Sequence, residues 1–399
     1  MRIALIGDTF PPLRTSGAVQ LRDLAREFGR QGHKLTVMIP SADLVTPYSL
    51  EKSDSFEVLR LGSPRTKDVG YIRRTASEFL MPLAMKRNLD LGPHRNTRWD
   101  GVVWYSPSIF LAPLVNHLKQ GGDCPSYLIL RDIFPQWALD MGLLKRGPVY
   151  SIFEGIANRQ YRAADIIGVQ SPGNLAFFER AQGLHAELEV LHNWLGAPSS
   201  NRCRIRISET SLAGRKILVY AGNMGVAQGM DILVELVDRL RQREDIGFIF
   251  VGRGGDALRI RNEIESRKLG NTLFFDEIDP DEIPDLYAQC HVGLVALDHR
   301  HTSHNVPGKF ISYLQAGLPV LATLNRGNDL ATMIGRNRIG RVSAANDIDH
   351  LVSMTTEILA ELQSDPELRS RCRTLFSSAF SATAAVSQIC DALRRNRNR

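Results

Sequence analysis

The stretch from His304 to Thr323, HNVPGKFISYLQAGLPVLAT, predicts a loop, a helix and a buried strand in succession. A Pro-Gly pair ends the preceding element, apolar residues then recur at helical spacing, and Gly317 supplies a helix stop before the apolar run PVLAT. A helix that begins beside Lys309 would point free backbone N–H groups and a positive charge at one spot, which suits a phosphate. The competing interpretation is an ordinary β-α-β segment with a surface lysine.

Strand and helix patterns alternate along the whole chain, which predicts parallel sheets with helices on both faces. The pattern is interrupted by the stretch HNWLGAPSSNRC, which loses periodicity and gains Gly, Pro, Ser and Asn, and it restarts at Lys216. We therefore expect an α/β fold of two doubly wound domains that face each other across a nucleotide-sized cleft. The expected parts are residues 1–195, residues 196–375 and a C-terminal helix in residues 376–399 that returns toward the first domain.

The composition excludes several classes of protein. Five cysteines form an odd set with no C-x-x-C pair, which argues against a disulfide framework or a zinc knuckle and favours a reducing compartment. The first residues, MRIALIGDTFPP, indicate a strand and its turn rather than a signal peptide. Because no run of about 18 apolar residues occurs, no membrane span is expected. We expect a cytoplasmic protein.

The net charge of +6 predicts an anionic partner, which could be a nucleotide, a nucleic acid or a lipid surface. Part of the excess lies in the arginine-rich tail, which we expect to be the frayed end of a helix. Residues 60–98 interleave basic with apolar side chains, a pattern typical of a helix that lies on an anionic membrane. The alternative is that the apolar face is simply core and the charges are solvated.

Polar residues follow the strand predicted at 127–130. Arg131 and Asp132 would lie at the carboxyl end of a parallel strand, where open α/β sheets bind their ligands. An aspartate there can orient or deprotonate a hydroxyl, while Trp137 would shape a wall. A salt bridge between Arg131 and Asp132 is the competing structural explanation.

Three glycine-rich turns follow predicted strands. The first, GDTFPPLRTSG, is too long for the dinucleotide fingerprint and places Gly17 at a helix start, where an acceptor or a phosphate could approach. The second, AGNMGVAQGMD, would allow close backbone approach to a ligand through Gly222. The third, GRGGD, is a weak signal because any tight β-α turn favours glycine.

Four stretches in this order and spacing resemble the GT-B fold glycosyltransferases of family 4 (group 1), in particular N-acetyl-fucosaminyl-type transferases of O-antigen and capsule biosynthesis. They are FPPLRTSGAVQLRDLAREFGRQGHKLTV, LRDIFPQWALDMGLL, ILVYAGNMGVAQGMDILVE and NVPGKFISYLQAGLPVLAT. The resemblance implies two Rossmann-like domains, a nucleotide-sugar donor held mainly by the second, and an acceptor held by the first. It also implies retention of anomeric configuration and no metal cofactor.

Carried onto this chain, the resemblance and the pattern together give the candidate site residues. A polyprenyl-diphosphate-linked acceptor, a UDP-type donor sugar and peripheral contact with the inner face of the cell membrane are expected, and nucleic acid is not. The catalytic candidates are Asp132, Lys309 and His304; the donor-binding candidates are Gly17, Gly222, Asn223, Gln228, Arg253, Gly254 and Ser312; the acceptor-binding candidates are Arg131 and Trp137.

The chain also departs from the family pattern. Family members commonly carry two glutamates with seven residues between them, and His304 and Ser312 stand at those positions here. Asn223 and Gln228 stand in the turn where many relatives carry an arginine and a lysine for the diphosphate. A degenerate, non-catalytic partner in glycan assembly is therefore the alternative function. The run DHRHTSH could suggest zinc, but without a fixed carboxylate or cysteine partner we expect a solvent-exposed or anion-binding loop.

Overall fold

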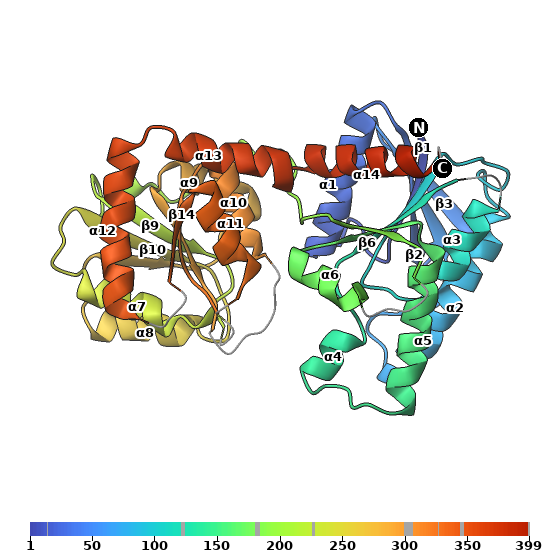
Figure 1. The fold of residues 1–399 in the computed structure, drawn as a ribbon, viewed down its shortest axis with the longest axis horizontal. Helices are drawn as coiled ribbons and strands as arrows, with labels where there is room; N and C mark the ends of the chain where they lie inside the picture. Colours follow the sequence, from blue (N-terminus) through green and yellow to red (C-terminus); the bar gives the residue numbers. More distant parts are fainter. Residues whose placement is uncertain are drawn as a thin grey trace. The chain divides into compact units, whose positions relative to one another are not determined.

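The computed structural model divides into two compact units (Figure 1). The first unit combines Met1–Gly196 with Ala382–Arg399, and the second is Ala197–Ser381. In the part of the chain that the structure describes, no helix is both long and apolar enough to cross a membrane. The described residues are 1–13, 15–120, 124–179, 184–225, 228–298, 306–325, 327–343 and 347–397.

The first unit is built on an eight-stranded sheet in the order β3-β4-β2-β1-β5-β6-β7-β8. Strand β3 pairs antiparallel with β4, whereas the strands from β4 to β8 pair in parallel. The sequence pattern did not predict this hairpin at the sheet edge. The strands are β1 (Arg2–Ile6), β2 (Lys34–Ser41), β3 (Tyr48–Lys52), β4 (Glu57–Gly62), β5 (Gly101–Tyr105), β6 (Ser126–Leu130), β7 (Ile166–Val169) and β8 (Glu187–Val190).

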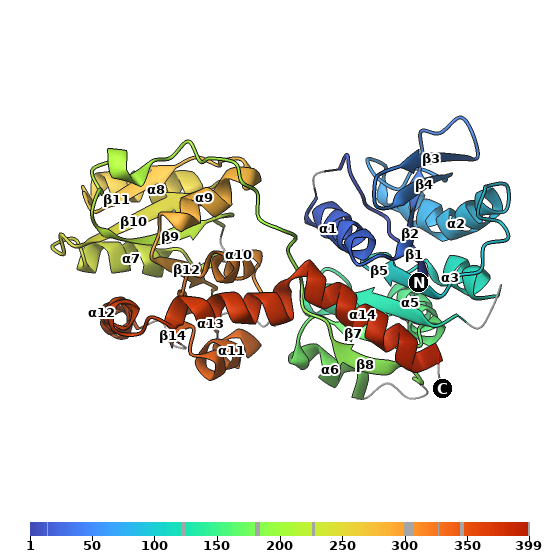
Figure 2. The ribbon, with the colours of Figure 1, turned by 90° about the horizontal axis from the view of Figure 1, so that it is seen from above.

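Helices cover both faces of this sheet, and each face has its own apolar core. Figure 2 shows α1 and α14 on one side of the strands and α2 and α3 on the other. Helix α1 begins after Thr15, whose hydroxyl accepts the Ala18 N–H at 3.2 Å, and it buries the face that carries Leu21, Leu24 and Phe28. The helices are α1 (Ser16–Arg30), α2 (Tyr71–Leu89), α3 (Ala112–Lys119), α4 (Gln136–Asp140), α5 (Pro148–Ala163), α6 (Pro172–Glu179) and α14 (Ala382–Arg397).

The last turn of helix α14 forms ion pairs with the rest of the unit. The helix is ordered up to Arg397, so the expectation that the arginine-rich tail is frayed is wrong for these residues. Arg395 pairs with Glu187 and Glu189, each at 3.2 Å, and Arg397 pairs with Asp100 at 2.9 Å. These carboxylates lie far from the tail in sequence, which is why composition alone could not reveal them. The charge of these two arginines is balanced within the unit and does not mark a binding surface.

The second unit is built on a six-stranded, fully parallel sheet in the order β11-β10-β9-β12-β13-β14. Its strands are β9 (Lys216–Ala221), β10 (Ile246–Val251), β11 (Thr272–Phe275), β12 (Val292–Ala296), β13 (Val320–Thr323) and β14 (Gly340–Ser343). Its α-helices are α7 (Asp231–Arg239), α8 (Ala257–Ser266), α9 (Ile283–Ala288), α10 (Gly308–Ala316), α11 (Asp329–Asn337), α12 (Ile348–Ser364) and α13 (Leu368–Leu375). Short helical turns add η1 (Ile207–Glu209), η3 (Pro280–Glu282) and η4 (Phe376–Phe380).

The helix and strand predicted after His304 are present as α10 and β13. Helix α10 begins at Gly308, and Gly317 ends it in the left-handed conformation with φ +76°. Strand β13 then enters the sheet between β12 and β14 with all four of its residues buried. The doubly wound α/β fold class predicted from the sequence is confirmed in both units.

Candidate active site

A cavity of about 550 Å³ opens in the second unit where β9 and β10 end, beside the start of α10. This is the edge at which parallel α/β sheets bind ligands. Its walls also include Glu277, Ile283 and Tyr287, which the sequence analysis did not single out. The candidate residues that line it are Gly222, Asn223, Gln228, Arg253, Lys309 and Ser312.

Two of the glycine-rich turns are pressed against each other to form one wall of this cavity. Gly252 has φ +153°, and a Cβ atom there would lie 2.0 Å from the Gly222 carbonyl oxygen. Gly254 has φ +143°, and its Cβ would lie 2.1 Å from the Met224 carbonyl oxygen. The Gly222 N–H donates to the Val251 carbonyl at 2.9 Å, and the Met224 N–H donates to the Arg253 carbonyl at 2.8 Å. Gly254 therefore has a structural reason to be glycine.

We expect Gly252→Ala to lower the free energy of unfolding by about 3 kcal/mol, because the new methyl group has no room and the backbone conformation is strained. Gly255→Ala is the matched control, since a Cβ at that position of the same turn meets no atom within 4 Å. Urea denaturation of the two variants measures the difference. Equal stability of the two would show that the turns separate easily.

Lys309 points its charge into this cavity from the first turn of α10. The Lys309 Nζ lies 3.7 Å from the centre of the Tyr220 ring, and its Cε lies 3.4 Å from the position of a Cβ at Gly222. Burial lowers the pKa of Lys309 to about 7. Among the residues that the structure describes, no hydrogen bond or ion pair to the Lys309 ammonium is seen. A cation and free helix N–H groups in one hollow together favour an anion.

The other polar candidates in the cavity are already engaged. Asn223 Nδ2 donates to Gln228 Oε1 at 3.2 Å, and the same oxygen accepts the Gly225 N–H at 3.0 Å. Arg253 pairs with Glu277 at 3.1 Å. This ion pair balances the charge of Arg253, so Lys309 is the unbalanced cation in the described lining.

Ser312 donates its hydroxyl hydrogen to the Gly308 carbonyl at 3.3 Å within α10. Its oxygen remains able to accept a hydrogen bond. His304, a catalytic candidate, lies outside the described residues, together with most of the DHRHTSH run. Of the described His, Cys, Asp and Glu residues, no three come together in a group that could hold a metal.

Sequence reasoning missed Glu277, which follows the end of β11 by two residues. A polar residue just beyond the carboxyl end of a predicted strand was the signal that could have identified it, as it identified Asp132. Tyr220, whose ring contacts Lys309, and Tyr287, which lines the cavity, were missed because both side chains are buried and these contacts depend on the fold.

In the first unit, Arg131 and Asp132 follow the end of β6. The Arg131 guanidinium donates to Tyr105 Oη at 2.7 Å, to Gln20 Oε1 at 2.8 Å and to Ser16 Oγ at 3.1 Å. Arg131 and Asp132, both described residues, form no salt bridge. The structural explanation that paired them is therefore wrong. Arg131 instead ties β6 to β5 and α1.

Asp132 and Asp8 are the titratable groups of interest at this edge of the first sheet. Burial raises the pKa of the Asp132 carboxyl, and the Arg131 charge opposes that rise. Burial also raises the pKa of Asp8, whose Oδ1 has no hydrogen-bond partner among the described atoms. Sequence analysis missed Asp8 although it stands two residues beyond β1. A half-buried carboxyl that makes no described hydrogen bond, as in Asp132, can accept a proton from a bound hydroxyl.

The remaining candidates of the first unit lie at the same edge. A Cβ at Gly17 would lie 3.7 Å from Arg131 Nη1, so the structure brings these two candidates together. Trp137 lies on α4, with its ring 6.1 Å from that of Phe134 and its side chain partly exposed.

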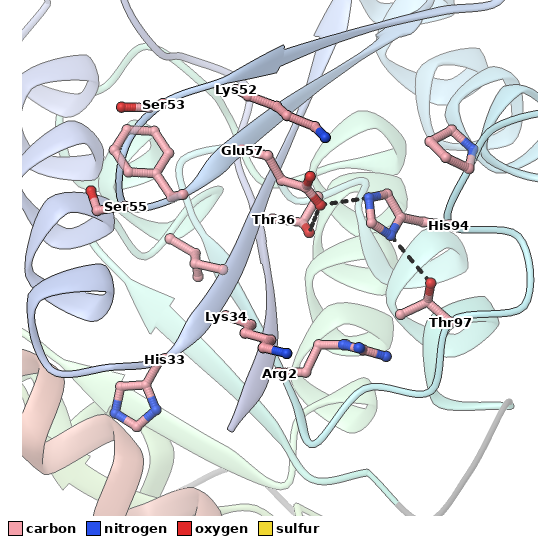
Figure 3. A pocket seen from close by; sticks show the side chains of 13 residues that line it. Arg2, His33, Lys34, Thr36, Lys52, Ser53, Ser55, Glu57, His94 and Thr97 are labelled. Carbon is pink, nitrogen blue, oxygen red and sulfur yellow. Dashed lines mark hydrogen bonds and ion pairs between the residues drawn. The ribbon is translucent and has the colours of Figure 1, made fainter.

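A second hollow, of about 500 Å³, opens at the opposite, amino-terminal edge of the first sheet (Figure 3). There Glu57 accepts a hydrogen bond from Thr36 at 2.8 Å and pairs with His94 at 2.7 Å, while His94 also lies 3.2 Å from the Thr97 hydroxyl (Figure 3). These polar groups contact one another, and none of the candidate residues lines this hollow. We assign it a structural role.

The comparisons with known proteins agree with this geometry. Residues 215–361 match the family model described as Glycosyl transferases group 1. The chain is 23% identical over 342 residues to the probable glycosyltransferase WbjE of Pseudomonas aeruginosa. The alignment covers 84% of this chain and 82% of that protein. It is 24% identical over 288 residues to the putative colanic acid biosynthesis glycosyl transferase WcaI of Escherichia coli (strain K12), which covers 63% of this chain and 67% of that protein.

A solved structure resembles the chain over nearly its full length. Anabaena Alr3699/HepE, solved in complex with UDP and glucose, has a TM-score of 0.63 at 14% identity and covers 98% of this chain and 99% of that one. The family match lies on the unit that holds the Lys309 cavity. Residues 215–361 thus form a domain of the group 1 glycosyl transferases, and the chain as a whole has the GT-B fold.

Proposed function

We propose that this protein is a glycosyltransferase that moves a sugar from a UDP-sugar, an N-acetyl amino sugar or a deoxysugar, to a polyprenyl-diphosphate-linked acceptor. The transfer proceeds with retention and without a metal, in the assembly of a bacterial surface polysaccharide. The observation that carries the proposal is the Lys309 ammonium, which lies in a cavity at a helix start with no anionic partner among the described residues. A nucleotide diphosphate supplies that anion.

The comparisons support the glycosyltransferase activity and the nucleotide-sugar donor of the proposal. WbjE and WcaI are named as glycosyltransferases, and the name of WcaI refers to the biosynthesis of colanic acid. Alr3699/HepE was solved with UDP and glucose, which supports a uridine nucleotide as the donor. We place the donor on the second unit and the acceptor on the first, with the protein at the inner face of the cell membrane.

The proposed chemistry assigns roles to Lys309 and Asp132. The bond between the anomeric carbon and the diphosphate oxygen breaks, and negative charge develops on the departing diphosphate, where Lys309 and the α10 N–H groups stabilise it. The acceptor hydroxyl oxygen bonds to the anomeric carbon on the face from which the diphosphate departs, which retains the configuration, and its proton passes to the Asp132 carboxylate. His304, at the position of the first family glutamate, is the third catalytic candidate.

Calorimetric titration with UDP, GDP and UDP-N-acetyl sugars tests the donor half of this proposal. We expect UDP species to bind at one site per chain and GDP to bind more weakly. Release of UDP in the presence of lipid-linked acceptors tests the transfer itself. If neither UDP nor any nucleotide sugar binds, the proposal is wrong.

A second candidate function, a non-catalytic partner in glycan assembly, is favoured by one observation. The Ser312 hydroxyl hydrogen is donated within α10, so this residue cannot donate to a ribose in that rotamer, and it lacks the second oxygen of a glutamate. Saturable UDP-sugar binding with no turnover on any lipid-linked acceptor would support this candidate over the transferase.

The pKa of Lys309 predicts that UDP binding takes up a proton. With a pKa of about 7, the free side chain is mostly neutral at about pH 8, and a bound diphosphate would restore the charge and raise the pKa. The affinity should therefore fall as pH rises above the free pKa, by up to about tenfold per pH unit. Titrations in two buffers of different ionisation enthalpy measure the uptake.

Lys309→Arg is the control for this linkage, because arginine stays charged throughout the range. Its UDP affinity should not follow the same pH dependence, and its binding should take up no proton. Identical pH profiles for the wild type and Lys309→Arg would contradict the assignment of the linkage to Lys309.

A further inference from the structure

We propose that residues 136–152, which we call the α4–α5 surface, insert into the headgroup region of an anionic membrane. This segment lies outside residues 60–98, where the sequence pattern indicated membrane contact. The inference deepens the proposed function, and it rests on that function only for the lipid-linked nature of the acceptor.

Exposed large apolar side chains gather on this surface. Five of them, at exposures of 44 to 72%, lie within these residues. In the described part of the second unit, the corresponding set contains Leu258 alone. Such clustering on one unit marks an interaction surface, whereas scattered apolar residues are ordinary. The five residues are Trp137, Met141, Leu143, Val149 and Ile152.

The surface is held by ordered contacts on its inner side. The N–H groups of Leu143 and Leu144 both donate to the Ala138 carbonyl, at 2.9 and 3.0 Å. Phe134 and Phe153 pack edge to face at 5.3 Å, which joins the approach to α4 with α5. The outward apolar side chains are therefore presented by a fixed backbone, which lowers the entropy lost on insertion.

The charges on this surface fit an anionic bilayer. Lys145 and Arg146 are exposed in the loop between the two helices, and among the described residues no ion pair to either is seen. The nearby acid Asp140 accepts a hydrogen bond from Gln136 at 2.7 Å. Basic residues near an anionic leaflet add electrostatic attraction to apolar insertion. Exposed apolar side chains beside these basic residues favour an anionic lipid, rather than another protein, as the binding partner of this surface.

The location of the surface matches the proposed route of the acceptor. Strand β6 ends at Leu130, Asp132 follows, and α4 begins at Gln136. The α4–α5 surface therefore lies at the carboxyl-terminal edge of the first sheet, the same edge as Asp132 (Figure 1). A lipid-linked acceptor whose anchor stays in the bilayer would present its saccharide at this edge.

Helix α2 also carries apolar residues, and they are partly buried and partly exposed. Its residues Met81, Met85 and Leu89 are buried in the core, which is what the alternative interpretation of residues 60–98 expected. The apolar residues of this helix divide between core and solvent, because five large ones are exposed: Tyr71, Ile72, Phe79, Leu80 and Leu83. The two segments expose similar numbers of large apolar residues, and we assign the membrane contact to the α4–α5 surface because it follows directly from Asp132 after β6.

Vesicle co-sedimentation of the full chain tests the inference. Wild type should bind vesicles that contain phosphatidylglycerol more tightly than vesicles of phosphatidylcholine alone. Leu143→Glu should weaken binding to the anionic vesicles by about tenfold or more, because a charge replaces an inserted apolar side chain. Leu258→Glu makes the same change at an equally exposed leucine of the second unit and should leave binding within about twofold of the wild type.

Tryptophan emission provides a second measurement at the site itself. Trp137 is exposed, whereas Trp99, Trp104 and Trp194 are buried. Vesicles should therefore shift the emission of Trp137 to shorter wavelength, and Trp137→Phe should remove the shift.

Several outcomes would overturn the inference. They are a wild type that does not bind anionic vesicles, a Leu143→Glu variant that binds as well as the wild type, and loss of binding only in Ile72→Glu, which would assign the contact to α2. A wild-type dimer that Leu143→Glu converts to a monomer without affecting vesicle binding would assign the face to a second copy. UDP titration of the wild type separates the two proposals, because a wild type that binds anionic vesicles but not UDP refutes only the proposed function.

Discussion

Asp132→Asn is expected to reduce sugar transfer by about 100-fold or more, while UDP-sugar affinity stays within about twofold of the wild type. The substitution keeps the size of the side chain and removes its ability to accept a proton. The described residues that line the Lys309 cavity all belong to the second unit, so the proposed donor site should not change. Steady-state UDP release with acceptor measures the loss, and calorimetry measures the affinity.

The stability of this variant is part of the prediction. Burial raises the pKa of Asp132, which means that its ionised form is disfavoured in the folded state, so a neutral amide should not destabilise the protein. Asp54→Asn, at an exposed position in the β3–β4 turn, is the matched control and should keep full activity. An Asp132→Asn variant that retains more than about a tenth of the wild-type rate would remove Asp132 from the proposed mechanism.

Lys309→Met is expected to weaken UDP binding at least tenfold, a loss of about 1.4 kcal/mol, without lowering the stability of the protein. Methionine retains the length of the side chain and removes the charge. The effect on uridine should be small, because uridine carries no phosphate for the ammonium to contact. Calorimetry with UDP and uridine separates the two contributions.

The sign of the stability effect follows from the pKa. The folded pKa of about 7 lies below the ordinary value of 10.5, so between these values the unfolded chain binds a proton that the folded chain has released. The stability of the wild type should therefore rise with pH through this window, and that contribution should vanish in Lys309→Met. Lys216→Met, at the amino-terminal end of β9, is the control. An equal loss of UDP affinity in both variants would contradict the assignment of the diphosphate contact to Lys309.

Local sequence could predict the helix and strand that follow His304, because their signals are short-range. Gly317 ends α10 in the left-handed conformation, which a glycine adopts readily, and the run from Val320 to Thr323 is continuously apolar because β13 is buried between two strands. The candidate residues around Lys309 meet in one cavity for the same reason, since turns after parallel strands share one sheet edge.

Other features depend on contacts that no local pattern contains. The β3–β4 hairpin is closed by the four residues Ser53–Phe56, which carry no Asn-Gly or Gly-rich turn signal. Arg395 finds Glu187 and Glu189 about half a chain away in sequence. Periodicity shows that α5 is amphipathic, but only the packing of its neighbours shows that Val149 and Ile152 stay uncovered.

Because α14 packs on the first unit, the polypeptide passes from one unit to the other twice, after Gly196 and after Ser381. A recombinant fragment that stops at residue 196 would leave Leu21, Leu24 and Phe28 of α1 without the cover that Val386 and Ile389 provide. During synthesis on the ribosome, the first unit likewise cannot close its core until the last helix has emerged. Independent production of this unit would therefore require α14 to be fused to it through a new linker.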